Sequence, residues 1–184
     1  MNNAASARNK TRRLVYAALF LALAQVLPFI TGQIPEIGAM LCPMHLPVLL
    51  CGFLCGWGWG LGVGFVAPLL RSVLFGMPAM FPDAVAMAFE LAVYGAATGW
   101  LRKKLPQTNA AVYAALLIAM ALGRVVWGAV KWALLGLTGA PFTFAAFLAG
   151  AVTNAVPGIL LQIAVIPLLV VAMEKAGLSL NGEK

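Results

Sequence analysis

Six apolar segments dominate the sequence, and their lengths restrict the fold more than any other feature. A helix that crosses the hydrocarbon core of a bilayer needs about 20 apolar residues, within a range of roughly 17 to 25. The apolar segments lie near residues 12–30, 44–57, 59–76, 83–101, 110–136 and 143–173. Charged residues make up only 9% of the chain, whereas a soluble domain carries about 25%. We therefore predict an all-α, polytopic membrane protein, a six-transmembrane-helix bundle in which residues 1–184 form a single domain.

The distribution of lysine and arginine predicts how this bundle is oriented. Basic residues that flank the predicted spans on one side of the bilayer are Arg8, Lys10, Arg12, Arg13, Arg102, Lys103, Lys104, Lys175 and Lys184. The loops predicted on the other side, near residues 31–43, 77–82 and 137–142, contain none. Because cytoplasmic loops are enriched in Lys and Arg, both termini are predicted to be cytoplasmic, with residues 1–11 as a basic N-terminal segment.

A cleavable signal peptide is the alternative interpretation of the first apolar segment. A basic flank, an apolar run and the sequence "ALA" at residues 22–24 are typical of such peptides. The apolar run continues to Ile30, however, and cleavage would leave only five spans. We therefore interpret this segment as the first transmembrane helix.

Small residues recur at helical spacing in two of the predicted spans. Glycine occurs every four residues from Gly52 to Gly64, a spacing that lets helix backbones approach closely in lipid. The sequence "GWGWG" at residues 56–60 equally predicts a tight cytoplasmic turn. Ala18 and Ala22 form a shorter ridge in the first span, which either packs inside the bundle or offers a smooth surface to a partner helix.

The cysteines and the sequence motifs exclude several functions. Cys42, Cys51 and Cys55 fall in one segment with a single histidine nearby, so we interpret them as small buried hydrophobic residues rather than metal ligands. The chain contains no G-x-x-x-x-G-K-[ST], no H-E-x-x-H and no G-x-S-x-G sequence. We expect neither an enzyme nor a cofactor, and the basic flanks lack the aromatic interleaving of a nucleic-acid-binding surface.

Four ionisable side chains lie inside the predicted spans: Arg71, Glu90, Arg124 and Lys131. A charge at the centre of a bilayer costs about 2.5–3.5 kcal/mol even on lenient scales, so such residues face the protein interior or a wet cavity and mark functional sites. Arg124 and Lys131 are seven residues apart and share a helix face with Trp127 and Gly128. Glu90 shares a stripe with Met87 and Tyr94.

His45, the only histidine of the chain, is predicted to join these charges. It lies between Pro43 and Pro47 at the head of the second span, and Pro47 suits the first turn of a helix because its missing N–H is no loss there. We predict that His45 faces outward into a polar chamber that it shares with Arg71, Glu90 and Lys131.

Two interpretations of the buried charges remain open. Glu90 forms an internal salt bridge and binds nothing, or the charges bind a ligand. One acid cannot neutralise three bases, and Asp83 and Glu36 are placed in loops at the rim. The excess of positive charge predicts an anionic ligand, which Arg would bind through paired hydrogen bonds and Lys as a point charge. Asn154 either adds hydrogen bonds from the far wall or bonds a neighbouring helix.

The chain resembles the substrate-binding membrane subunits (S components) of energy-coupling factor (ECF) vitamin transporters. The resemblance covers essentially the whole chain and rests on the ordered stretches "PMHLPVLLCGFLCG", "APLLRSVLFGMP" and "AMAFELAVYG", together with the basic N-terminus and the A-x-x-x-A pair of Ala18 and Ala22. The stretches are most similar to the pantothenate-type (PanT-like) branch.

The resemblance implies partners and a mechanism. An S component binds its vitamin in an outward-facing pocket that is closed by the loops after the first, third and fifth spans. It associates with a transmembrane coupling protein (EcfT-like), which Ala18 and Ala22 would contact, and with two cytoplasmic ATPases (EcfA-like), and it topples in the membrane to carry the pocket inward. The predicted substrate-binding residues are His45, Arg71, Glu90, Tyr94, Arg124, Trp127, Lys131 and Asn154.

The identity of the ligand and the class of protein each have alternatives. A pocket with more bases than acids favours an anionic vitamin such as pantothenate over a cation such as thiamine, whose binding calls for carboxylates and aromatic faces. Folate is also anionic, and riboflavin is a further candidate. A membrane scaffold similar to the rod-shape morphogenesis protein MreD has the same small six-span architecture without a transported ligand, and an enzyme of lipid or quinone chemistry is the third alternative.

Overall fold

The computed structural model describes residues 2–30 and 40–181, and this part of the chain is helical without β-strands. The elements are α1 (Asn2–Ile30), α3 (His45–Cys55), α4 (Trp57–Phe75), η1 (Met80–Ala84), α5 (Val85–Lys104), α6 (Asn109–Leu137), α7 (Phe144–Leu148), η2 (Ala149–Thr153) and α8 (Val156–Lys175). Each apolar segment of the sequence corresponds to one helix or to consecutive helical pieces. The predicted all-α membrane bundle is therefore confirmed.

Five helical segments of the described chain are long and apolar enough to cross a membrane. They are Ala7–Ile30, Trp57–Phe75, Met80–Lys104, Asn109–Leu137 and Phe144–Lys175. The exception is α3, which has 11 residues and is about 16 Å long at 1.5 Å per residue, half of the roughly 30 Å hydrocarbon thickness. The short second span expected from the sequence is thus a short interior helix.

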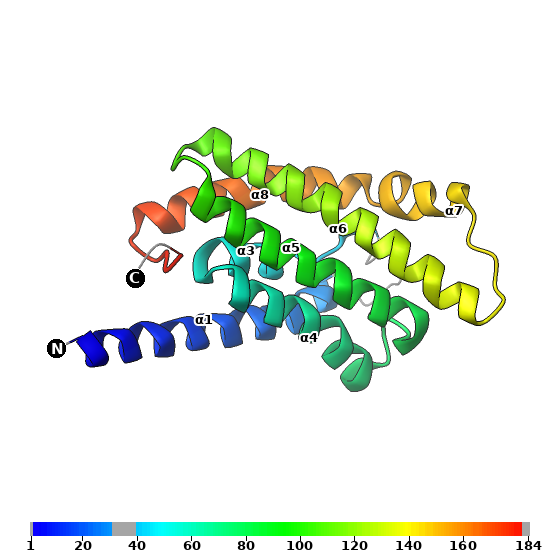
Figure 1. The fold of residues 1–184 in the computed structure, drawn as a ribbon, viewed down its shortest axis with the longest axis horizontal. Coiled ribbons are helices and arrows are strands. Elements are labelled where there is room, and N and C mark those ends of the chain that lie inside the picture. The colour runs from blue at the N-terminus through cyan, green and yellow to red at the C-terminus, as the bar shows by residue number, and fades with distance from the viewer. Residues whose placement is uncertain (1, 31–39, 182–184) are drawn as a thin grey trace.

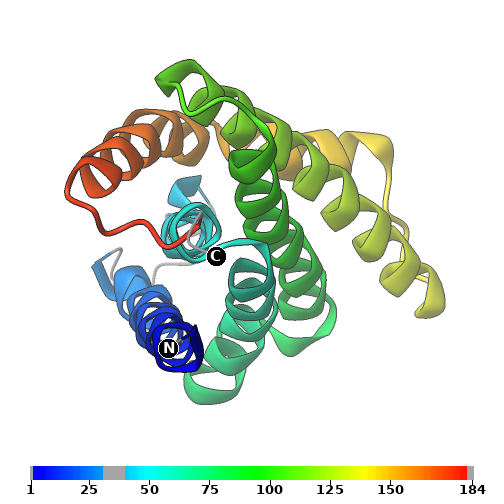
Figure 2. The same ribbon diagram turned by 60° about the vertical axis from the view of Figure 1, so that its left-hand side comes forward.

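Helix α3 lies at the centre of the bundle (Figure 2). Ten of its 11 residues are buried, and it packs against α1, α4, α5 and α8. Helix α6 lies outside this inner group and packs against α5 and α8. The two ends of the chain lie at the same end of the molecule (Figure 1). Because α3 is surrounded on all sides, polar groups at its start are kept away from lipid.

The closest helix contact joins α4 and α5 through glycine. A Cβ at Gly60 would lie 2.5 Å from the carbonyl oxygen of Gly95, and a Cβ at Gly64 would collide with the backbone of Leu91. Close approach through glycine is confirmed here. The turn is shorter than "GWGWG" predicted, because only Gly56, with φ of 98°, leaves the helical conformation and α4 begins at Trp57.

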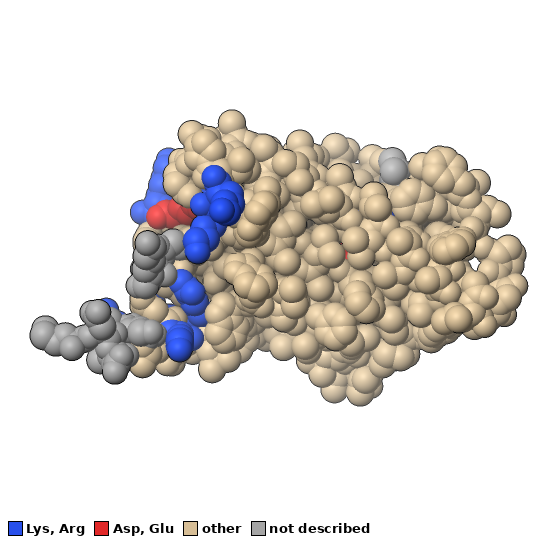
Figure 3. Space-filling model, in the orientation of Figure 1, with Lys and Arg blue, Asp and Glu red and all other residues tan. Residues whose placement is uncertain are grey.

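Basic side chains gather at the end of the bundle that holds the termini (Figure 3). Arg102 donates two hydrogen bonds to Glu174, of 2.8 and 2.6 Å, and so joins α5 to α8. The segment after α8 returns to the helices there: the amide of Leu180 donates to the carbonyl of Leu54, and Arg13 donates to the carbonyl of Leu180. We refer to this part of the molecule as the basic end.

Candidate functional site

Glu90 forms the centre of a buried polar cluster at the junction of α3, α5 and α6. Its carboxylate Oε1 lies 3.0 Å from Nη1 of Arg124 and 3.6 Å from Nε2 of His45. Glu90 is only 1% exposed. An ionised carboxylate is stable in such a place only if it is paired, and Arg124 supplies the opposite charge.

His45 and Tyr94 complete the cluster, and their rings meet edge to face. The ring centroids are 5.4 Å apart with an interplanar angle of 63°. His45 is 2% exposed and Tyr94 is fully buried. The expectation that His45 looks outward from the mouth of a chamber is therefore wrong in the described structure: the first turn of α3 begins inside the bundle and takes the imidazole with it.

Arg124 links the cluster to the segment before α3. Its Nη2 lies 3.7 Å from the sulfur of Cys42, a residue with φ of 49° at the bend that precedes the helix. The Arg124 side chain keeps 14% exposure. We use the term polar cluster for His45, Glu90, Tyr94 and Arg124.

The polar cluster has more hydrogen-bonding capacity than it uses. Buried atoms in it without a well-aligned hydrogen bond among the described residues are Nδ1 and Nε2 of His45, Oε1 of Glu90, the hydroxyl of Tyr94 and Nε of Arg124. Of these, Nε2 of His45 and Oε1 of Glu90 take part in the ion-pair contacts above, and the Tyr94 hydroxyl contacts the Glu90 carboxylate, so Nδ1 of His45 and Nε of Arg124 are the two atoms for which no polar contact is found in the described part of the chain. A buried polar atom without a partner costs about 1–3 kcal/mol, and native proteins contain few of them. Ligand binding by this cluster stays a prediction, which the incomplete hydrogen bonding of His45 and Arg124 supports.

Arg71 lies in a different environment, between α4 and α1. Its Nη1 donates a 2.7 Å hydrogen bond to the carbonyl of Gln25, and its guanidinium lies over the rings of Phe29 and Phe75, at 5.4 and 5.1 Å from their centroids. Among residues 2–30 and 40–181, no carboxylate lies within ion-pair distance of it. Arg71 is thus a buried cation held by aromatic faces and a backbone oxygen.

Lys131 is also separate from the polar cluster. Its Nζ lies 2.8 Å from Oδ1 of Asp83 and 5.1 Å from the ring centroid of Trp127. The sequence suggested Glu90 as the single acid available to the three buried bases. This is wrong for Lys131, because Asp83 of η1 supplies a second carboxylate. The positive excess is correspondingly smaller. Trp127 does share a helix face with Lys131, as expected, and stacks on Phe147 at 6.3 Å.

Asn154 is not brought to the polar cluster by the described structure. Asn154 is exposed and lies in the turn between η2 and α8, because the sixth apolar segment is interrupted there rather than continuous. Glu36, expected at the rim, lies outside the described residues. Cys42, Cys51 and Cys55 are buried, and no group of metal-binding side chains occurs in the described part of the chain.

The sequence analysis missed Gln162 and the pairing of Asp83. Gln162 is 1% exposed on α8, and neither its amide nitrogen nor its carbonyl oxygen has a hydrogen-bond partner in the described structure. A glutamine among "GILLQIAVIPLL" was a detectable signal, since it is an amide in an otherwise apolar run. The Asp83–Lys131 contact was not detectable, because it joins residues 48 apart.

Helix α1 presents a second surface of interest. Ala17, Phe20 and Ala24 face the bundle, whereas Ala18 and Ala22 are exposed. The alanine ridge is therefore not packed inside the described bundle, and its contact with a partner helix stays a prediction. The helix contacts α3 and α4 through its other face.

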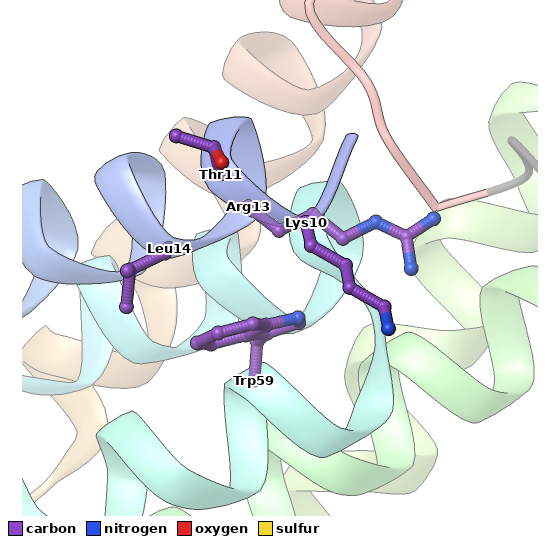
Figure 4. Close-up of a pocket in the computed structure, with 5 residues that line it drawn as sticks. All are labelled: Lys10, Thr11, Arg13, Leu14 and Trp59. Atoms are coloured by element: carbon purple, nitrogen blue, oxygen red, sulfur yellow. The ribbon is translucent and has the colours of Figure 1, made fainter. Parts of the chain in front are cut away.

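A pocket of about 440 Å³ lies at the basic end of the same helix. Four residues of α1 and one of α4 line it: Lys10, Thr11, Arg13, Leu14 and Trp59 (Figure 4). Leu14 is four residues before Ala18, so the pocket continues toward the alanine ridge along α1. It lies at the opposite end of α4 from Arg71 and is distinct from the polar cluster.

Comparison with known proteins identifies one family. The family model described as "ECF transporter, substrate-specific component" matches residues 12–170. No curated protein and no solved structure matches the chain significantly. The match covers all the helices that contribute to the polar cluster.

Proposed function

The chain belongs to the family of ECF transporter substrate-specific components, and we propose that it captures pantothenate or a related vitamin outside the cell for ATP-driven uptake. Members of this family are transporter subunits, so the chain is a transport protein of the membrane and not an enzyme or a morphogenesis scaffold. An energising module of a coupling protein and ATPases belongs to such a transporter.

The basic end of the bundle is assigned to the cytoplasm. Lysine and arginine in short segments beside spans are retained on the cytoplasmic side, and Arg102, Lys103 and Lys104 close α5 at the end that holds both termini. Helix α3 then begins toward the outside and ends toward the cytoplasm. His45 at its start therefore lies on the outer side of the bundle.

The polar cluster is the proposed ligand site, and its unpartnered buried atoms are the observation that carries the proposal. Glu90 and Arg124 neutralise one another, so the polar cluster carries no excess charge from this pair. The hydrogen-bonding atoms of the cluster therefore favour an uncharged, polar part of a ligand. Arg71 is the proposed partner for a carboxylate, because its described contacts include no acid. Trp127, Lys131 and Asn154 are placed at the periphery.

Pantothenate has the chemical groups that Arg71 and the polar cluster are proposed to bind. It combines a carboxylate with an amide and hydroxyl groups, so it suits both a cation and a neutral cluster of donors and acceptors. Folate and riboflavin differ from pantothenate in size and in the number of charges, and native mass spectrometry distinguishes the three by mass.

The exposed ridge of Ala18 and Ala22 is the proposed contact for the EcfT-like coupling protein. Small side chains let a partner helix approach closely in lipid. The adjoining pocket of Lys10, Arg13 and Trp59 extends this surface toward the two EcfA-like ATPases in the cytoplasm.

The identity of the ligand is tested by native mass spectrometry of the subunit purified in mild detergent. Cells are grown with pantothenate, riboflavin and folate in the medium, and the mass added to the chain is measured. A bound mass equal to pantothenate supports the full proposal, and a mass equal to another vitamin replaces the ligand but keeps the site. A protein that repeatedly carries no vitamin, and binds none when each is added, contradicts the proposal.

A further inference from the structure

Gln162 carries a second group of unsatisfied hydrogen bonds, on α8. The side chain is 1% exposed, and both its Nε2 and its Oε1 lack a partner among the described residues. An amide placed among apolar side chains loses the hydrogen bonds that it made to water. Two unpaired atoms on one buried side chain destabilise the ligand-free subunit. Packing alone does not explain why a glutamine occupies this position.

The start of α8 packs closely on the segment that precedes α3. A Cβ on Gly158 would lie 2.6 Å from the carbonyl oxygen of Met40 and 2.9 Å from the backbone of Leu41. Gln162 is one turn further along the same buried stripe, about 6 Å deeper at 1.5 Å per residue.

Helix α6 connects this part of α8 to the polar cluster. Arg124 reaches Cys42, which directly follows the residue that Gly158 contacts, and α8 packs against both α3 and α6. The start of α3 is therefore enclosed by α5, α6 and α8. Below it the stripe of α8 becomes wholly apolar, with Ile166 and Val170 fully buried in the core, so Gln162 is the last polar group on this face before the core.

We propose that Gln162 is a ligand-contacting residue that forms the α8 wall of the substrate site and determines specificity for an amide-containing ligand. The inference rests on the proposed function. A glutamine side chain offers one donor group and one acceptor side by side, and a ligand amide presents the complementary acceptor and donor. A site of this kind rejects an analogue that lacks one of the two groups, because its own buried atom is then left unpaired.

The test measures ligand affinity and the stability of the empty subunit together. In Gln162→Leu, and in the more flexible Gln162→Met, we expect the affinity for pantothenate to fall about tenfold or more, since hydrogen bonds are lost. The melting temperature of the ligand-free subunit should stay the same or rise, because an unpaired buried amide has been removed. A residue that only supports the fold would lower that temperature.

Thr98→Val is the matched control. Thr98 is fully buried and polar, but its hydroxyl donates within its own helix to the carbonyl of Tyr94 at 2.8 Å. Its hydrogen bond is complete without a ligand, so this substitution should leave the affinity for pantothenate within about twofold.

An ester analogue of pantothenate, in which oxygen replaces the amide N–H, tests the specificity directly. Wild type should bind the ester about tenfold more weakly than the amide, whereas Gln162→Leu should bind both alike. Equal discrimination by wild type and variant, or unchanged affinity in both variants at position 162, overturns the inference and leaves the proposed function intact. If wild type binds none of pantothenate, riboflavin and folate, the proposed function itself fails.

Discussion

Arg124 on α6 and Glu90 on α5 form an ion pair with a nitrogen–oxygen distance of 3.0 Å, and the carboxylate is 1% exposed. The two residues are 34 positions apart in the sequence and come from adjacent antiparallel helices. Beside this pair, Nε of Arg124 and Nδ1 of His45 have no hydrogen-bond partner among the described residues. The internal salt bridge of Glu90 is therefore present in the structure, and the binding of a ligand by the same cluster stays a prediction.

Removing one member of this pair should destabilise the protein. In Glu90→Gln the Arg124 guanidinium loses its counter-charge. We expect the free energy of unfolding to fall by about 3 kcal/mol, which is near the lower limit for a broken buried ion pair. The loss is at this lower limit because the Arg124 side chain keeps some exposure to solvent. The double variant Glu90→Gln with Arg124→Met should lose less than Glu90→Gln alone. Denaturant unfolding in detergent measures this cycle, and strictly additive losses would show that the two side chains are not coupled.

Lys131 and Arg124 should behave differently, although the sequence places them on one helix face. Lys131 pairs with an Asp83 side chain that is 45% exposed, and exposed pairs contribute about 0–1 kcal/mol. Lys131→Ala should therefore change the free energy of unfolding by less than about 1 kcal/mol and ligand affinity by less than about threefold. Arg124→Ala should weaken binding more than about tenfold, as expected for a desolvated charge. Calorimetric titration with the identified vitamin compares the two, and equal effects would return Lys131 to the site.

The contact of α4 with α5 should not tolerate a methyl group at Gly60. In Gly60→Ala the new Cβ meets the carbonyl oxygen of Gly95, which cannot move without displacing α5, and we expect a loss of about 1–3 kcal/mol. Gly62→Ala is the control on the same helix, since no atom lies within 4 Å of a Cβ there. It should stabilise the helix by about 0.5–1 kcal/mol. Thermal unfolding of the two variants measures the difference, and identical melting temperatures would show that the helices are not in close contact.

The alanine ridge of α1 should be needed for uptake but not for binding. Ala18→Trp with Ala22→Trp places bulky rings on an exposed face, so vitamin affinity of the isolated subunit should remain unchanged while ATP-driven uptake is lost. Ala114→Trp, at an exposed alanine of α6, controls for bulk at a lipid-facing position and should transport normally. Uptake assays with the reconstituted transporter measure both, and normal uptake by the α1 variant would exclude the docking role.

The sequence predicted the architecture because the bilayer imposes simple rules on it. A helix is the only way for an isolated span to satisfy its backbone in lipid, so apolar length was enough to place most helices within a few residues of their observed bounds. The start of α1 is the exception: the helix begins at Asn2 and includes the basic residues that were predicted to precede it. The interruption of the last segment at Asn154 was not predicted, since neither length nor hydropathy registers a local turn. The shortness of the second segment was visible, but its central position in the bundle was not.

The sequence by itself determined which side chains are polar, at what depth they lie and which share a helix face. Only the tertiary structure decided their partners: Glu90 with Arg124 and His45, Lys131 with Asp83, and Arg71 with two aromatic rings. It also buried Gln162 on α8 without a hydrogen-bond partner among the described residues. The physical reason is that depth and facing follow from the 1.5 Å rise and 3.6-residue period of a single helix, whereas a pairing depends on how two helices are arranged around a third.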